Sequence, residues 1–439
     1  MNANWEIKKL GDIITLQRGH DLPSQARKHG QIPIMGSSGI TGYHNQFKAK
    51  GPGVIIGRSG NSMGQVSYVS ENYWPLNTCL YVTDFKGNCP EFIYYFLKQI
   101  NFEQFNSGSA QKSLNRNAVY PFEVKFPTSY KIQSTIASIL FALENKIKLN
   151  QEINQTLEQM AQALFKSWFI DFEPVKAKIA VLEAGGSQED ATLAAMIAIS
   201  GKDADSLAIF ELEHLEKYAE LRATAELFPS VIQNSEQGEI PEGWGISTIG
   251  DTYSVVMGQS PKGETYNEDN EGTLFFQGRA EFGWRYPSPR LFTTDPKRMA
   301  KKGSILLSVR APVGDLNIAM TECCIGRGLA SLIHKSESTS FSYYQLNNLR
   351  SIFSKFNGEG TVFGSINQKD LKSIKIISPS EEVISSFTSN AGFFDLMILN
   401  LSKEILALQQ LRDVLLPRLL SGEITLSEAE ELVKEADYV

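Results

Sequence analysis

Two distant segments of this chain begin with the same pattern, and this internal repeat constrains the fold more than any other feature. Trp5 stands six residues before Gly11 and Asp12, and Trp244 stands at the same distance before Gly250 and Asp251. Further matching segments follow in the same order in both halves: 53–69 with 303–319, 91–98 with 340–349, 107–115 with 359–367, and 124–129 with 376–380. This shared order indicates a tandem duplication, in which a globular domain and a helix are followed by a connector, a second globular domain and a second helix.

The globular halves have the pattern of mixed α and β domains. Short β-rich runs are separated by Gly, Asn and Pro turns, and an aromatic amphipathic helix is expected at 91–98 and at 340–349. The Gly-Asp pair of each half is expected to form a turn before the first strand. The connector, 171–242, is acidic and Ala-rich, with helical patterns at 190–199 and 206–226.

A long helix is predicted after each globular half. Residues 131–170 contain no Gly or Pro, and their apolar residues recur at steps of three and four, as in a coiled-coil seam. Asn150 and Asn154 occupy positions where the seam should continue, and polar residues there fix register at a cost in stability. The second helix is expected from Glu382 to Leu416, with Pro417 ending or kinking it.

An isolated helix with an apolar seam is unstable in water, so each long helix needs a partner. We expect the partner to be the other long helix; the alternative is that each helix is packed inside its own domain. The residues expected in this packing are Ile136, Leu143, Ile147, Leu157, Leu164, Trp168, Phe394, Leu401, Ile405 and Leu408.

Charge is distributed unevenly along the chain, although the whole chain carries a net charge of −7. Counting Lys and Arg against Asp and Glu gives +5 for 1–130, −10 for 171–242 and +4 for 243–380. Two mildly basic blocks are weak evidence for phosphate contact; the alternative is random variation of a few charges.

The cysteines and the hydropathy favour a cytoplasmic protein. None of the four cysteines belongs to a CxxC pair, which favours reduced thiols. The first residues lack an apolar signal core, and no apolar run approaches the ~20 residues that span a bilayer.

Motifs for catalysis are missing from the sequence. There is no GxxxxGK[ST], no GxGxxG, no GxSxG, and no Asn- or Asp-Pro-Pro-aromatic tetrapeptide of the kind that amino-methyltransferases use. The five histidines are scattered, with no carboxylate or cysteine at metal spacing. These observations predict a chain that catalyses nothing alone and holds no metal.

Polar and cationic side chains gather in the loops at equivalent places of both halves. Arg can read guanine, Asn and Gln can read adenine, and Lys and Ser can contact phosphate. The alternative for each residue is a solvated surface charge or a simple turn. The candidate DNA-binding residues are Arg18, His20, Arg27, Lys28, Arg58, Ser59, Asn61, Ser109, Gln111, Lys112 and Asn115 in the first half, and Gln259, Ser260, Lys262, Arg279, Arg285, Arg310, Thr361 and Phe363 in the second.

Taken together, the motifs resemble the specificity subunit of type I restriction-modification systems. The resemblance covers essentially the whole chain. The segments that carry it are the two Trp…Gly-Asp openings, "GEIPEGW" at 238–244, the helix ending in "FKSWFIDFEPV" within 126–175, and "LLPRLLSGEI" at 415–424.

This resemblance implies an α+β fold with two target-recognition domains and two helices packed as an antiparallel coiled coil, in an elongated pseudo-twofold arrangement. Each domain would read one half of a bipartite site in double-stranded DNA, and the helices would set the spacer. Methyltransferase (M) subunits carrying S-adenosylmethionine would dock on the helices, and a restriction (R) subunit would join for cleavage. No cofactor is expected in this chain. The expected boundaries are 1–130, 131–172, 173–240, 241–380 and 381–439.

Two other readings of the sequence stay open. One is the specificity component of a related bipartite-site assembly in which methylation and cleavage share one partner chain. The other is a non-catalytic interaction scaffold. The role of the connector at 176–226 is also open.

Overall fold

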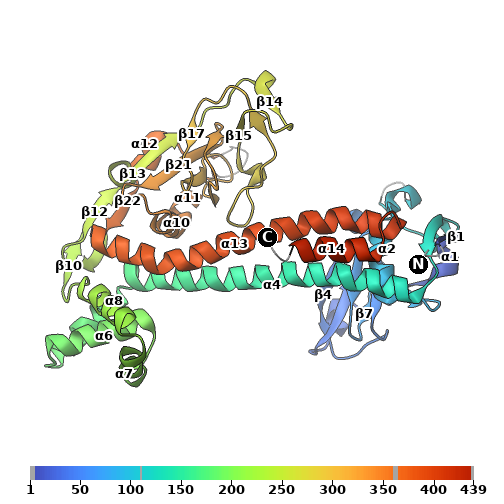
Figure 1. The fold of residues 1–439 in the computed structure, drawn as a ribbon, viewed down its shortest axis with the longest axis horizontal. Coiled ribbons are helices and arrows are strands. Elements are labelled where there is room, and N and C mark those ends of the chain that lie inside the picture. Colours follow the sequence, from blue (N-terminus) through green and yellow to red (C-terminus); the bar gives the residue numbers. More distant parts are fainter. Residues whose placement is uncertain (1–4, 109–110, 359–363, 437–439) are drawn as a thin grey trace. The chain divides into compact units, whose positions relative to one another are not determined.

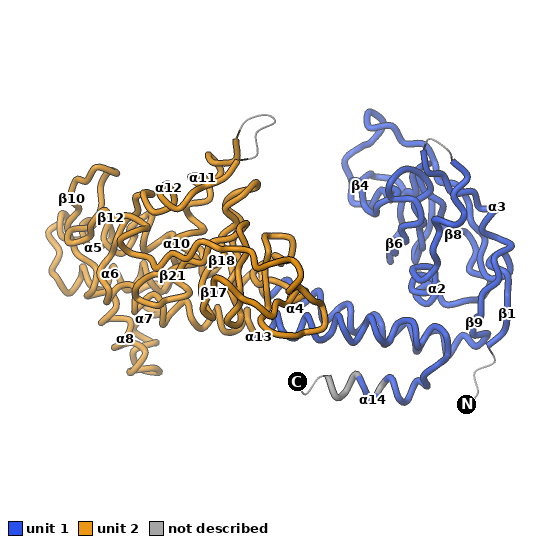
Figure 2. The backbone as a smooth tube through the Cα atoms, turned by 90° about the horizontal axis from the view of Figure 1, so that it is seen from above, with its two compact units in different colours: residues 1–153, 400–439 blue, residues 154–399 orange. Residues whose placement is uncertain are grey.

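The computed structural model describes residues 5–108, 111–358 and 364–436 of the chain (Figure 1). The candidate residues Ser109, Thr361 and Phe363 lie outside these ranges. The chain forms two compact units (Figure 2), unit 1 from residues 1–153 and 400–439, and unit 2 from residues 154–399.

Unit 1 begins with a pair of strands that brings the start and the end of its globular domain together. Strand β1 (Trp5–Lys9) pairs antiparallel with β9 (Glu123–Pro127), so that Trp5 lies opposite Pro127. The Gly-Asp pair, expected as a turn, lies within the one-turn helix α1 (Leu10–Ile13), which leads into β2 (Thr15–Arg18).

The central sheet of unit 1 is antiparallel, in the order β2-β8-β5-β6. Its inner strand β5 is buried along its whole length, which explains its unbroken apolar sequence. A second sheet has the order β4-β3-β7. The remaining elements are β3 (Ile32–Gly36), β4 (Gly39–His44), β5 (Gly53–Gly57), β6 (Val66–Val69), β7 (Trp74–Pro75), β8 (Cys79–Asp84), α2 (Pro90–Lys98) and α3 (Arg116–Val119).

Unit 2 repeats this topology. Strands β12 and β22 pair as β1 and β9 do, and the sheet β13-β21-β18-β19 has the connectivity of β2-β8-β5-β6. The longer second copy has five strands (β14-β16-β15-β20-β17) where the first has three. Its elements are β12 (Gly245–Thr248), α9 (Ile249–Thr252), β13 (Tyr253–Met257), β14 (Tyr266–Asn267), β15 (Thr273–Phe276), β16 (Phe292–Thr293), β17 (Met299–Ala300), β18 (Ile305–Ser308), β19 (Leu316–Ile318), β20 (Cys323–Ile325), β21 (Leu329–His334), α10 (Thr339–Asn348), α11 (Arg350–Ser354), α12 (Gln368–Ser373) and β22 (Lys375–Ser378).

The connector folds as four short helices and a hairpin. The expected helix at 190–199 is present, whereas the one expected at 206–226 is divided at His214. Ala195, Met196, Leu207 and Ala225 form its small core. The elements are α5 (Glu173–Glu183), α6 (Gln188–Ser200), α7 (Ala204–Glu213), α8 (Leu215–Glu226), β10 (Ile232–Ser235) and β11 (Gly238–Pro241).

The two long helices are α4 (Tyr130–Phe169) and α13 (Glu381–Ser421), and the short helix α14 (Leu426–Ala436) follows them. Pro417 is expected to end or to kink the second helix; helix α13 continues through it, so the first alternative is wrong and the second stays a prediction. The two long helices run antiparallel: in unit 1 Lys146 forms an ion pair with Glu404 at 3.1 Å, and in unit 2 the Phe165 and Phe387 rings are 5.7 Å apart.

The ten residues that the seam assigns to helix packing can be placed by their burial. All ten are buried or partly buried, and both seam asparagines, Asn150 and Asn154, are buried as well. Within the described residues, no helix is long and apolar enough to cross a membrane.

Candidate DNA interface

Each globular domain has a groove or pocket, of about 630 Å³ in unit 1 and about 430 Å³ in unit 2. The groove of unit 1 brings predicted residues together. Its volume is 630 Å³, and it is lined by the loop after β2, by Arg58 after β5, and by the segment that leads into α3. Three loops that are far apart in the sequence therefore converge. The candidates that line this groove are Arg18, His20, Arg58 and Asn115, and Arg116 joins them.

The groove side chains are held in place by main-chain groups. Arg58 donates from Nη1 to the carbonyl of Asn77 at 3.3 Å, and Arg116 donates from Nη1 to the carbonyl of Leu16 at 3.0 Å. The Asn115 side chain accepts from the N–H of Asn117 at 3.0 Å and caps α3. Because each arginine uses one nitrogen for its anchor, its other N–H groups remain for a ligand.

The other described candidates of unit 1 lie outside the groove lining. Arg27 donates to the carbonyl of Thr41 at 3.4 Å, and Lys112 forms an ion pair with Glu103 at 2.7 Å. The remaining candidates outside the lining are Lys28, Ser59, Asn61 and Gln111. No group of three or more His, Cys, Asp or Glu side chains in the described part of the chain could hold a metal ion.

Unit 2 carries its candidates at the equivalent ends of the equivalent strands. Gln259 and Ser260 follow β13 as the groove loop follows β2, and the Ser260 hydroxyl accepts from the N–H of Arg327 at 3.3 Å. Arg310 follows β18 and forms an isolated bridge with Ser365, as Ser59 does with Ser113 in unit 1. Lys262 is exposed and lies 3.8 Å from Glu264.

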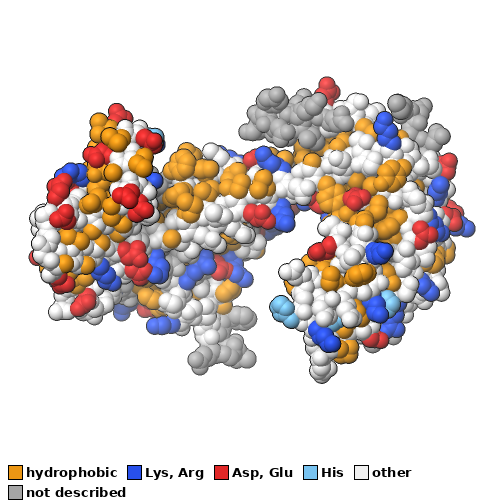
Figure 3. Space-filling view, turned by 90° about the horizontal axis from the view of Figure 1, so that it is seen from below, with side chains coloured by type: hydrophobic (Ala, Val, Ile, Leu, Met, Phe, Trp, Pro, Cys, Tyr) orange, Lys and Arg blue, Asp and Glu red, His pale blue; other side chains and the backbone are white. Residues whose placement is uncertain are grey.

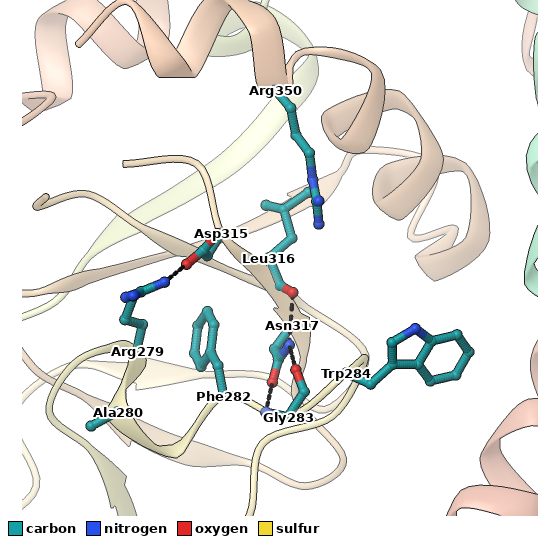
Figure 4. A pocket seen from close by; sticks show the side chains of 9 residues that line it. All are labelled: Arg279, Ala280, Phe282, Gly283, Trp284, Asp315, Leu316, Asn317 and Arg350. Carbon is teal, nitrogen blue, oxygen red and sulfur yellow. Dashed lines mark hydrogen bonds and ion pairs between the residues drawn. The ribbon is translucent and has the colours of Figure 1, made fainter. Parts of the chain in front are cut away.

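A pocket of 430 Å³ in unit 2 includes the candidate Arg279 in its lining, but none of the four candidates just described (Figure 4). Arg279 forms an ion pair with Asp315 at one side, and Arg350 reaches in from α11. The Asn317 side chain holds Gly283 by two hydrogen bonds of 3.0 Å, and the neighbouring Trp284 is 51% exposed. Sequence reasoning missed Arg350, because a single arginine at a helix start belongs to no motif.

Arg285 is the candidate that the structure contradicts. It is only 1% exposed and forms ion pairs with Glu158 of α4 and Asp395 of α13, so it is not available to DNA in this structure. Burial alone disfavours its charged form, yet the carboxylates of Asp395 and Glu158 outweigh burial and raise the pKa of Arg285. The guanidinium therefore stays charged and serves an internal contact.

The surface of the units shows no single-sign field on the face drawn in Figure 3. Lys and Arg side chains there are interspersed with Asp, Glu and hydrophobic side chains. On this face, charge alone therefore does not mark a DNA-binding surface.

Comparison with known proteins identifies the repeat. A family model described as the type I restriction modification DNA specificity domain matches residues 2–159 and again residues 241–390. The chain belongs to this family. Each matched range contains one of the two copies seen in the sheet topology, together with the first part of the long helix that follows it. The family's specificity subunits are therefore the proteins to which this chain corresponds.

Individual members of the family agree with this assignment. The chain is 34% identical over 307 residues to the specificity subunit of the type I restriction enzyme HindI from Haemophilus influenzae, covering 66% of this chain and 67% of that protein. It is 22% identical over 468 residues to the MjaIX specificity subunit from Methanocaldococcus jannaschii, covering 97% of this chain and 94% of that protein. The fold resembles the crystal structure of the type I restriction-modification S subunit from M. genitalium, with a TM-score of 0.61 at 16% identity over 95% of this chain and 96% of that one.

Proposed function

We propose that this specificity subunit reads a bipartite target in double-stranded DNA, one half-site with each globular domain. The observation that carries the proposal is the unit 1 groove, where loops from three parts of the domain place Arg18, His20, Arg58, Asn115 and Arg116 around 630 Å³. Arginine and asparagine are the side chains that pair bidentately with guanine and adenine in the major groove. The second domain repeats the framework with different loop residues, which suits a different half-site.

Partner subunits supply the chemistry in this proposal. Methyltransferase (M) subunits bring S-adenosylmethionine and the methyl-accepting site, and a restriction (R) subunit joins them for cleavage in the cytoplasm. This chain contributes recognition and catalyses nothing itself.

The long helices are the docking surface that we propose for the M subunits. In unit 2, Phe393 and Leu396 of α13 are 63% and 58% exposed, whereas Ala391 and Ile398 on the opposite side are buried. Exposed large apolar side chains that are grouped on one face are typical of a protein interface. The same helices set the unspecified spacer between the half-sites.

The decisive experiment is a map of methylated adenines in cells that express the complete complex. We expect one bipartite motif with a fixed spacer. Exchange of residues 1–126 for another recognition domain should change one half-site only, and a change in both half-sites would refute the assignment of one domain to each.

A second measurement separates DNA reading from a scaffold role. Duplex affinity of the assembled complex should fall steeply as salt rises and should depend on sequence. Affinity that is weak, insensitive to salt and independent of sequence would favour the interaction scaffold.

A further inference from the structure

Both units contain the same contact between a tyrosine of the globular domain and a carboxylate of a long helix. In unit 1, the Tyr95 hydroxyl of α2 donates to Glu144 of α4 at 2.7 Å. In unit 2, the Tyr344 hydroxyl of α10 donates to Asp395 of α13 at 3.0 Å. Each tyrosine is the second of a Tyr-Tyr pair at matching places of the repeat.

A cation completes each contact by lying over both tyrosine rings. Lys98 Nζ is 4.9 Å and 5.8 Å from the ring centroids of Tyr94 and Tyr95, and 3.4 Å from Glu144. Arg285 Cζ is 4.5 Å and 5.4 Å from the ring centroids of Tyr343 and Tyr344. We call this set of one cation, two tyrosines and a helix carboxylate the helix joint.

The two helix joints differ in how many elements they connect. Lys98 belongs to the same helix as its tyrosines, binds one carboxylate and is 35% exposed. Arg285 comes from a loop, is almost fully buried and binds two carboxylates, Glu158 of α4 and Asp395 of α13. The planar guanidinium has five N–H donors in a fixed fork, so it can hold both carboxylates at once, which a lysine ammonium cannot do with the same geometry.

The loop that Arg285 anchors also carries exposed side chains, among them the DNA-contact candidate Arg279. Trp284 is the direct neighbour of Arg285, and Arg279 lies at the other end of the same pocket (Figure 4). The carbonyl of Arg285 accepts from the N–H of Ile318 at 2.9 Å, which ties the loop base to β19. The position of this loop on the helix pair of unit 2 therefore depends on Arg285.

We propose that Arg285 is a positioning residue for recognition, which fixes the second domain on its helix pair and thereby makes the complex strict about spacer length. This inference rests on the proposed function. Adding one base pair to a spacer moves a half-site along the DNA axis and rotates it, because a helical turn takes about 10–10.5 base pairs. A domain that can tilt on its helices would accept such a displaced half-site, whereas a domain held by the helix joint would not.

The test removes the joint without leaving a buried charge unpaired. Replacement of a buried ion triad by apolar residues of similar volume is often neutral or stabilising, whereas removal of one partner is strongly destabilising. The variant is therefore Arg285→Leu/Glu158→Leu/Asp395→Leu, assembled with its partner subunits. Arg298→Leu, an exposed arginine in the same domain, is the control. Methylation rates are compared on duplexes with the native spacer, a spacer one base pair shorter, and one longer.

We expect the triple variant to methylate the native site at close to the wild-type rate. The ratio of native to altered-spacer rates should fall about tenfold, which corresponds to about 1.4 kcal/mol, while the Arg298 control keeps it. A folded triple variant with the full wild-type ratio would overturn the inference. If the triple variant does not fold, the deciding variant is Arg285→Lys, because it keeps the positive charge and loses the planar guanidinium. A reduced ratio of native to altered-spacer rates then supports the positioning role of Arg285, and an unchanged ratio overturns it.

The outcomes also separate this inference from the function on which it rests. If the wild-type complex itself shows no preference for a bipartite sequence or for one spacer, the proposed function fails. If the wild type shows both preferences and the variants keep them, only the positioning role of Arg285 fails.

Discussion

Arg58 and Arg116 lie in one groove, yet their environments predict different effects on DNA binding. Arg58 is partly buried and its guanidinium is fixed by the Asn77 carbonyl at 3.3 Å, which leaves its other edge preorganised for a base. A bidentate contact to guanine is worth about 1–3 kcal/mol at one base pair. Arg58→Ala should therefore relax one position of one half-site, while the salt dependence of binding hardly changes. Arg116 is exposed and is expected to contact phosphate.

Loss of a phosphate contact has another signature. Arg116→Ala should weaken binding on all sequences alike and reduce the slope of log affinity against log salt by about 0.9. The assay is a titration of the assembled complex with single-base target variants at several salt concentrations, with Lys50→Ala, an exposed residue outside the groove, as control. Uniform weakening by Arg58→Ala with a smaller salt slope would refute its base-reading role, and no effect of either arginine would exclude the groove as the site.

Three further predictions concern stability. Trp168 is fully buried and its indole N–H has no hydrogen-bond partner among the described residues; Trp168→Ala should lower the free energy of unfolding by about 3–5 kcal/mol, and Trp168→Phe by about half as much or less, in denaturant titrations. Burial lowers the pKa of His334 to about 4. As the pH falls, the unfolded chain takes up this proton near pH 6.5 and the folded chain only near pH 4, so the free energy of unfolding should decrease by up to about 1.4 kcal/mol per pH unit between pH 6.5 and 4. His334→Gln should flatten this pH dependence. Gly422 has φ +71° and an added Cβ would lie 2.6 Å from the Trp5 ring, so Gly422→Ala should lower the melting temperature more than Gly87→Ala, whose φ is +81° with nothing within 4 Å.

The repeat and the long helices could be predicted from the sequence because both depend on local spacing. Apolar steps of three and four place Ile136 and Leu143 on one face of a helix wherever the helix lies. Pro417 shows the limit of such rules. Its ring disfavours a helix interior by about 3 kcal/mol, but the helix continues because Leu415 and Leu419, on either side of it, are buried in the core of unit 1.

The candidate site was harder to predict because its partners are distant in the sequence. Arg285 stands in a polar, aromatic loop, and its two carboxylate partners are 127 and 110 residues away along the chain. No local pattern distinguishes such an arginine from a neighbour such as Arg279, which is exposed. By contrast, Arg18 ends β2 and Arg58 directly follows β5 of the same sheet, so that the strand ends themselves bring them to one groove.

Unit 1 is assembled from two stretches of chain, 1–153 and 400–439, with all of unit 2 encoded between them. During translation, the apolar face of α4 that includes Ile136 and Leu143 must wait for Leu408 and Leu415 to emerge. At about 5–20 residues per second, the interval is roughly 10–50 s. Throughout it, this face lacks the α13 side chains that share its core, while the residues of unit 2 are all made before α13 is complete. The order of synthesis thus completes the core of unit 1 last, although that unit is the first to begin.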